Sequence, residues 1–323
     1  MLDLKHILIL VISSAYIIMY GQESSQYTLY MGQKYALNLA YAGLESSLSV
    51  TGAVRSQWQE LPGAPNTKII QAQMPLYYLN GAGGIKIEQE NFGAEKTIRG
   101  LVSYNYVFQS RIGLFSGGVG IVFIQKSLDG TLLRTPQGKY EGTIFQHNDP
   151  SIFENVLSGI TPQLSAGLYF AQDRLEVGLS LENFHSPRLK FNRSTAEYGL
   201  KPRLNFYSEY RIDLLESLAL TPSLLIKSNL SRFQLDISAL AEINGKIFGG
   251  LGFRGYSSRT FDAISILTGL KINANMKVFY GFDITLSGIK SAQQGTHEFM
   301  LNYNLHKAIG AVEREPIIFN PRY

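Results

Sequence analysis

The sequence predicts an all-β fold, namely a transmembrane antiparallel β-barrel of about 14 strands with an N-terminal segment packed in its lumen. From about residue 47 onward, apolar and polar residues alternate, which places them on opposite faces of each strand. Most alternating stretches are 9–13 residues long, whereas strands of soluble proteins average about 5–6 residues and strands that cross a bilayer need about 9–11. Tight turns and longer loops also alternate along the chain, as they do in outer-membrane barrels.

The composition excludes several other classes of protein. Of the 323 residues, 45% are hydrophobic, only 17% are charged and none is cysteine. Abundant aromatic residues and a low net charge argue against disorder, and the lack of cysteine excludes a disulfide scaffold and cysteine-ligated metal sites. The 29 basic residues are spread thinly along the chain, so we expect no nucleic-acid partner.

Residues 1–21 are predicted to be a signal peptide. A short basic start at Lys5 is followed by an apolar stretch of about 14 residues, and the small residue Gly21 offers a cleavage position. A membrane-spanning helix would need about 20 apolar residues, so an uncleaved membrane anchor is the alternative. Export through this segment predicts an outer-membrane protein.

Residues 22–46 show no strand alternation and contain many aromatic residues. A segment this aromatic is expected to pack inside the barrel as a plug, the alternative being a disordered lead-in. The plug residues we propose from the sequence are Tyr27, Tyr30, Met31, Asn38, Tyr41 and Gly43.

The barrel itself is predicted over residues 47–305. In the stretch 175–182, for example, Leu175 and Val177 fall on one face, and Glu176 and Gly178 fall on the other. The predicted strands are 47–57, 66–77, 81–90, 95–108, 112–126, 162–172, 174–184, 202–213, 218–228, 231–243, 246–256, 262–273, 276–287 and 295–305.

The connections support a barrel with both termini in the periplasm. Those after even-numbered strands are tight, whereas those after odd-numbered strands include the long stretches 127–161 and 185–201. A soluble β-sandwich or a string of small β-domains is the alternative, although no linker divides residues 47–305. The glycine pairs at 83–84, 117–118 and 249–250 are expected to mark bends of the wall.

The first outer loop and the strand before it carry further candidates. Trp58 precedes a turn of sequence PGAP, in which the candidates are Pro62, Gly63 and Pro65. This loop either clamps a partner or holds an aromatic residue at the membrane interface. Arg55 lies on the polar face of the first strand, so we expect it in the lumen, paired with an acid such as Glu176, Asp236 or Asp283, or binding a ligand.

The long outer loops are candidates for selecting a partner, because loops tolerate variation that a barrel wall does not. The alternative is a lid over the pore. Residues 306–323 are predicted to form a periplasmic tail that contacts components of a larger machine, and Arg322 is the candidate in it.

No enzymatic site is recognisable. The chain contains neither a Gly-x-Ser-x-Gly nor a His-Glu-x-x-His motif, and it has no P-loop. His297 and Glu298 are adjacent in a strand, so their side chains point to opposite faces and cannot share a metal. His297 is instead a candidate for binding a partner or the plug. We expect no catalytic residue, metal or cofactor.

Several short motifs resemble one known family. They are QYTLYM at 26–31, NLAYAG at 38–43, RSQWQELPGAPNT at 55–67, GTHE at 295–298 and NPRY at 320–323. In this order they resemble the PorP/SprF family of the Bacteroidetes type IX secretion and gliding system, whose stretches read approximately N-P-A-Y-A-G and R-x-Q-W…P-G-A-P-x-T. The chain departs from the family pattern at Leu39, Asn91 and Tyr323.

The resemblance implies an outer-membrane barrel in one of two roles. Some members contact the periplasmic ring and peptidoglycan-linked components of the secretion machine. Others help to export one large surface protein, such as an adhesin, and hold its C-terminal domain at the cell surface. A porin or small-solute transporter, contacting only membrane lipid, is the alternative function.

Overall fold

The computed structural model describes residues 25–140, 146–149, 152–185, 187–192, 197–257 and 260–307. The predicted signal peptide lies outside the described residues, as does the predicted tail from residue 308 onward, including Arg322. Among the described residues, none of the helices is long and apolar enough to cross a membrane.

Strands make up most of the chain, and the helices are short. The strands are β1 (Ser49–Ser56), β2 (Asn66–Leu76), β3 (Gly81–Phe92), β4 (Glu95–Ser110), β5 (Gly113–Asp129), β6 (Val156–Ala171), β7 (Leu175–Glu182), β8 (Arg188–Lys190), β9 (Glu197–Gly199), β10 (Arg203–Tyr210), β11 (Ile212–Leu215), β12 (Leu218–Ser228), β13 (Phe233–Ile243), β14 (Ile247–Ser257), β15 (Thr260–Lys271), β16 (Met276–Thr285) and β17 (Thr296–Asn304). The helices are η1 (Tyr30–Gly32), α2 (Lys34–Leu37), η2 (Leu39–Tyr41), η3 (Tyr77–Leu79), η4 (Gly130–Leu132) and η5 (Gly288–Ala292).

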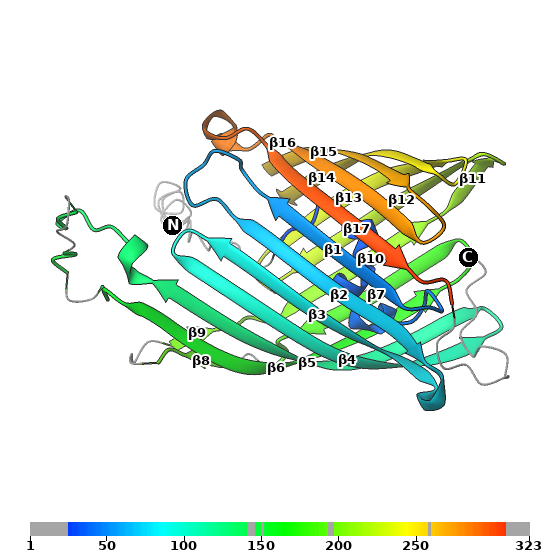
Figure 1. The fold of residues 1–323 in the computed structure, drawn as a ribbon, viewed down its shortest axis with the longest axis horizontal. Coiled ribbons are helices and arrows are strands. Elements are labelled where there is room, and N and C mark those ends of the chain that lie inside the picture. Colours follow the sequence, from blue (N-terminus) through cyan, green and yellow to red (C-terminus); the bar gives the residue numbers. More distant parts are fainter. Residues whose placement is uncertain are drawn as a thin grey trace, which may run out of the picture.

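The strands form a closed antiparallel barrel (Figure 1). Consecutive strands pair from β1 to β7 and from β11 to β17, β1 pairs with β17, and β10 pairs with both β7 and β12. Strands β8 and β9 pair only with each other. Because β11 continues β10 along the edge of β12, the two occupy one position in the wall, which gives the 14 strand positions predicted from the sequence. Closure pairs the backbone groups of the wall within the sheet, as a bilayer requires.

The two ends of the barrel differ in the length of their connections. The turns after β2, β4, β6, β11, β13 and β15 are two to four residues long, and we call this end the periplasmic end because short turns face the periplasm in outer-membrane barrels. The other end, which we call the outer end, carries the long connections 130–155 and 183–202.

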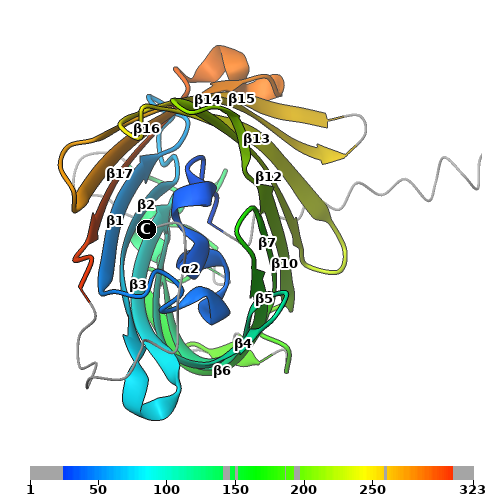
Figure 2. The same cartoon turned by 90° about the vertical axis from the view of Figure 1, so that its right-hand side faces the viewer.

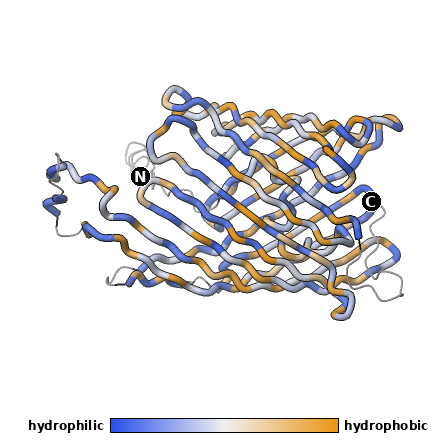
Figure 3. The backbone as a smooth tube through the Cα atoms, in the orientation of Figure 1, coloured by the Kyte–Doolittle hydropathy of each residue, from blue (hydrophilic) through white to orange (hydrophobic). Residues whose placement is uncertain are grey.

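Hydrophilic and hydrophobic residues alternate along the strands (Figure 3), and their burial shows that the wall separates a polar lumen from an apolar outer surface. On β7, Glu176 and Ser180 point inward and are each 3% exposed, whereas Leu179 between them points outward and is 42% exposed. The same inversion occurs on β2, where Gln71 is buried beside the exposed Ile70. This alternation confirms the predicted two-faced strands and explains why a membrane protein contains so few charges and a near-neutral mean hydropathy.

Two regions of the wall differ from the sequence prediction. The sixth strand begins at Val156 rather than at residue 162, so β5 and β6 form a longer hairpin at the outer end than expected. Alternation does continue there, with Leu157 buried and Ile160 exposed, but Gly159 and Pro162 obscure it in the sequence. The expected loop 185–201 also contains the small hairpin β8–β9.

Candidate functional site

Residues 25–46, here called the lumenal segment, lie inside the ring of strands (Figure 2). The segment folds as three consecutive short helices, η1, α2 and η2. The Asn38 side chain caps η2 by accepting a hydrogen bond from the backbone N–H of Ala40 (3.0 Å). Tyr30 and Tyr35 are each 1% exposed, so the segment forms the core of the barrel instead of hanging free.

A buried ion network joins the lumenal segment to the wall at β1, β14, β16 and β17. Arg55 Nη2 lies 2.9 Å from Asp283 Oδ2, and Arg55 Nη1 lies 3.2 Å from Glu298 Oε2. Arg254 contacts the same Asp283 oxygen at 2.9 Å. Thr28 of the lumenal segment donates its backbone N–H to Glu298 (2.6 Å) and its hydroxyl to Asp283 (2.9 Å). The wall acids therefore bind both the wall arginines and the segment.

Arg55 is lumenal and only 3% exposed, as predicted. Of the three acids proposed as its partners, Asp283 is correct, whereas Asp236 pairs with Arg254 and Glu176 pairs with Lys34. The partner that the prediction missed is Glu298, which stands directly opposite Arg55 in the β1–β17 register. That register joins the first and last strands and becomes visible only once the barrel is closed.

Lys34 forms a second attachment between the segment and the wall. Its Nζ lies 2.8 Å from Glu176 Oε2 and 2.6 Å from Glu209 Oε1. Tyr169 donates its hydroxyl to Glu176 (2.5 Å). One ammonium group thereby compensates two carboxylates that are each less than a tenth exposed, which is how a buried charge becomes tolerable.

A third attachment lies nearer the outer end. The Tyr27 and Ser25 hydroxyls both donate to Glu88, which Arg99 also contacts at 2.8 Å. Lys227 from the opposite part of the wall donates to the backbone carbonyl of Ser25 (2.7 Å). The start of the described chain is thus held from two sides of the barrel.

Wall side chains also bind the backbone of the lumenal segment. Asn105 donates to the carbonyls of Ala40 (3.2 Å) and Ala42 (2.9 Å). Lys86 donates to the carbonyl of Ala36 at 2.9 Å. Such bonds satisfy the carbonyls that short helices leave unpaired at their ends. The polar side chains of the wall are therefore complementary to the backbone of the lumenal segment.

Glycines of the wall make room for the segment. A Cβ at Gly84 would lie 2.4 Å from the Tyr35 ring, and one at Gly118 would lie 2.6 Å from Leu39. We expected these two glycines to mark bends, but at both positions the structure shows close approach of the lumenal segment. Even a methyl group there would displace the segment or the wall.

The remaining candidates of the lumenal segment are also placed against the wall. Tyr41 packs edge-on against Tyr169, with ring centroids 5.2 Å apart. Gly43 has a φ of +74° and donates its N–H to the Gln73 side chain (2.9 Å). Met31 is partly buried and packs on the core at the periplasmic side.

The candidates of the first outer loop lie away from the lumenal segment. Trp58 is half-buried and donates its backbone N–H to Thr296 Oγ1 (3.1 Å). Pro62 and Gly63 are exposed, and the Gly63 carbonyl accepts from the N–H of Gly93 in the next outer turn (2.8 Å). Pro65 is buried and accepts from the Gln57 N–H (2.9 Å). The loop is therefore tied to both of its neighbours.

His297 faces outward, whereas Glu298 beside it is fully buried in the lumen, so the two side chains do point to opposite faces. The His297 ring lies 2.7 Å from the Tyr280 hydroxyl and packs against Phe282. No group of three or more His, Asp or Glu side chains among the described residues is arranged to hold a metal ion.

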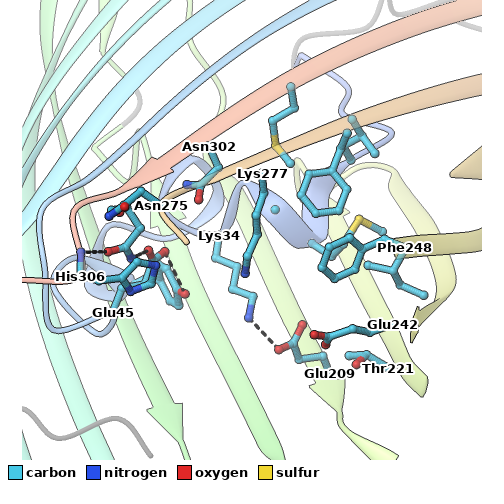
Figure 4. Close-up of a pocket in the computed structure, with 18 residues that line it drawn as sticks. Lys34, Glu45, Glu209, Thr221, Glu242, Phe248, Asn275, Lys277, Asn302 and His306 are labelled. Carbon is cyan, nitrogen blue, oxygen red and sulfur yellow. Dashed lines mark hydrogen bonds and ion pairs between the residues drawn. The ribbon is translucent and has the colours of Figure 1, made fainter. Parts of the chain in front are cut away.

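A cavity of about 210 Å³ lies between the lumenal segment and the wall (Figure 4). Its polar side includes Lys34, Glu209, Glu242 and Lys277, and its apolar side includes Phe248. Asn275 in the β15–β16 turn places the cavity at the periplasmic end. The sequence prediction did not include it.

At the outer end, the β8–β9 hairpin packs on the lumenal side of the β5–β6 extension. Leu189 of β8 is fully buried, and Lys126 lies 3.9 Å from the centroid of the Tyr198 ring of β9. A Cβ at Gly159 would lie 2.3 Å from the backbone oxygen of Lys190. The β8–β9 hairpin can therefore pack against β6 only because residue 159 is glycine.

Replacing Gly159 by leucine is expected to lift the β8–β9 hairpin off the wall, because the new side chain meets backbone that cannot rotate away. Tryptic cleavage after Arg188 and Lys190 should then become severalfold faster in the folded barrel. Gly199→Leu is the matched control, since a Cβ there meets nothing within 4 Å. Equal cleavage rates in the two variants would contradict this packing.

Residues 19–303 match the family described as type IX secretion system membrane protein PorP/SprF. The chain belongs to this family. The PorP/SprF match spans the lumenal segment and nearly all of the barrel wall, so the resemblance seen in the short motifs extends through the fold.

Two solved structures are similar to this PorP/SprF protein at low identity. The outer membrane protein Omp33 of Acinetobacter baumannii is 8% identical, with 80% of this chain and 97% of that chain covered and a TM-score of 0.45. The toluene transporter TbuX of Ralstonia pickettii is 11% identical, with 80% and 88% covered and a TM-score of 0.46. No curated protein shows significant sequence similarity to the chain.

Proposed function

We propose that this PorP/SprF protein is a non-enzymatic outer-membrane scaffold of type IX secretion that works by binding other proteins. Its partner would be a large exported surface protein, such as an adhesin held through its C-terminal domain, or a periplasmic component of the secretion machine. The family match supports the system in which it acts.

The observation that carries the scaffold role is the lumenal segment. The Lys34 ion pairs, hydrogen bonds from Thr28, Ser25 and Tyr27 to buried wall acids, and a series of backbone hydrogen bonds fix it to the wall. Loss of these contacts would leave Glu176 and Glu209 buried without their cation. A transporter needs a passage for its solute, whereas this lumen is occupied by the protein's own chain. Binding at the barrel's two ends is then the function that the architecture supports best.

The proposal is tested by purifying the tagged barrel from its native outer membrane and identifying co-purifying proteins by mass spectrometry. We expect a large surface protein or secretion components in stoichiometric amount, compared with an unrelated barrel carrying the same tag. We also expect the purified barrel to be closed in planar bilayers. Recovery of the barrel alone, together with high conductance, would favour the porin or transporter alternative.

A further inference from the structure

The outward face of β16, β17, β1, β2 and β3 contains a groove of about 700 Å³, here called the lateral groove. These five strands lie side by side in the wall (Figure 1). Two neighbouring rows of the strand register line the groove, one passing from Phe299 through Val54 to Lys68 and the other from Val278 through Gly52 to Ile70. The groove therefore crosses the strands instead of following one of them.

Gly52 on the outward face of β1 leaves the lateral groove open. A Cβ at this position would meet only the backbone oxygen of Ile69, at 3.9 Å, so the space above Gly52 is empty. The neighbours Val54 and Ile70 are both exposed on the same face. Because an unfilled apolar groove lacks packing contacts on one side, an acyl chain of the surrounding membrane would fill it favourably.

The two ends of the lateral groove lie toward opposite ends of the barrel. Lys68 is the third residue of β2, which follows the first outer loop, whereas Val278 is the third residue of β16, which follows a periplasmic turn. The groove thus runs obliquely from a cationic outer end to an apolar end nearer the periplasm. A lipid in the outer leaflet has the same polarity, with its headgroup outermost and its acyl chains toward the middle of the membrane.

Lys68 is an unusual residue on the lipid-facing surface. On the outward faces of β1 to β6, all of which the structure describes, the charged side chains are Lys68, Lys96 and Asp129. Asp129 accepts hydrogen bonds from the N–H and the hydroxyl of Thr131 (2.9 and 2.6 Å). Within the described residues, no acid pairs with Lys68. A lysine near the membrane surface extends its ammonium group toward the headgroups, where a phosphate supplies the opposite charge.

From this arrangement we propose that the lateral groove binds one phosphorylated lipid of the outer leaflet, with an acyl chain over Gly52 and the phosphate at Lys68. Gln89 lies directly opposite Lys68 in the β2–β3 register and also lines the groove, so its amide can donate to the same phosphate. An apolar segment of another protein could fill the groove but would leave the ammonium group without a counter-charge. The inference goes beyond the proposed function and does not depend on it.

The proposal is tested by native mass spectrometry of the purified barrel in detergent. Bound lipid is counted against increasing concentrations of phosphatidic acid with two 16-carbon chains, and of the diacylglycerol with the same chains. We expect one saturable site for phosphatidic acid, and the diacylglycerol should require roughly fivefold higher concentrations. Inorganic phosphate at the same concentrations should not displace the lipid, because it lacks the acyl chain.

Four variants locate the site. Lys68→Gln should weaken binding of phosphatidic acid by roughly fivefold, whereas Lys96→Gln, which removes the same charge outside the groove, should leave it unchanged. Gly52→Leu fills the groove and should weaken binding of both lipids by roughly tenfold. Gly249→Leu is its control, because Gly249 is an outward-facing glycine of β14 at which a Cβ also meets nothing within 4 Å.

Equal binding of the two lipids, or unchanged binding in Lys68→Gln, would overturn the role of the phosphate. Unchanged binding in Gly52→Leu would overturn the groove as the site and leave only the general lipid layer around a barrel. Every variant must first show the heat-dependent gel shift of a folded barrel, and Gly52→Val takes the place of Gly52→Leu if the larger side chain prevents folding.

Discussion

Removing residues 25–43 is expected to convert a closed barrel into one that conducts ions. These residues fill the lumen, and the wall around them is lined by buried polar and charged side chains, such as Arg55, Asp283 and Glu298. Without the segment, water would hydrate those groups and form a continuous path, as in barrels whose interior is polar and unfilled. Single-channel recording in planar bilayers measures the effect.

The control for this deletion is removal of residues 187–200, which carry the β8–β9 hairpin but none of the lumenal segment. That variant should remain closed. Both barrels must first show the heat-dependent shift in gel mobility of a folded barrel. If the full chain and the variant lacking residues 25–43 conducted equally, the lumenal segment would not be what closes the barrel.

Replacing Arg55 by methionine is expected to cost about 3–5 kcal/mol of unfolding free energy, the loss typical of removing one partner from a buried ion pair. The substitution keeps a long side chain, but Asp283 then retains only Arg254 as a cationic partner. Glu298 loses its ion pair with Arg55. Urea unfolding of the barrel in detergent or lipid, followed by gel mobility, measures the change.

Lys68→Met is the matched control, because Lys68 is exposed on the outward face of β2 and lies in register with Val54, the residue before Arg55. It should leave the stability unchanged or slightly raised. A loss below about 1 kcal/mol for Arg55→Met, the size of a surface ion pair, would show that the network does not hold the lumen together.

The wall was predictable because its periodicity is local. Each strand carries the alternation within its own residues, so the count of 14 positions and most boundaries follow without knowledge of any partner strand. The wrong boundary lies where glycine and proline interrupt the alternation of apolar and polar residues, as Gly159 and Pro162 do in β6. The hairpin β8–β9 was missed because strands of three residues are too short to show alternation.

The interior was less predictable, because its contacts join residues far apart in the chain. The Thr28–Glu298 bond spans 270 positions, and no local pattern identifies such a pair. A usable signal was present all the same, since charged residues at inward positions of strands must find partners. Applied to Glu176, Arg99 and Arg254, which are buried at inward positions of β7, β4 and β14, that rule would have marked all three attachments of the lumenal segment before their partners were known.

The closure of the wall between β1 and β17 also constrains how the protein is assembled. The lumenal segment precedes β1 in the chain, yet it binds Asp283 and Glu298 on the last two strands. Threading it through a finished ring would require it to enter at one of the two ends of the closed barrel and then form all of its buried contacts inside. We expect the segment to bind the wall strands before β1 and β17 pair, so that its contacts with the last two strands help to bring β17 next to β1. Such distant pairings make folding slow, and they make membrane insertion the step at which this barrel is most exposed to error.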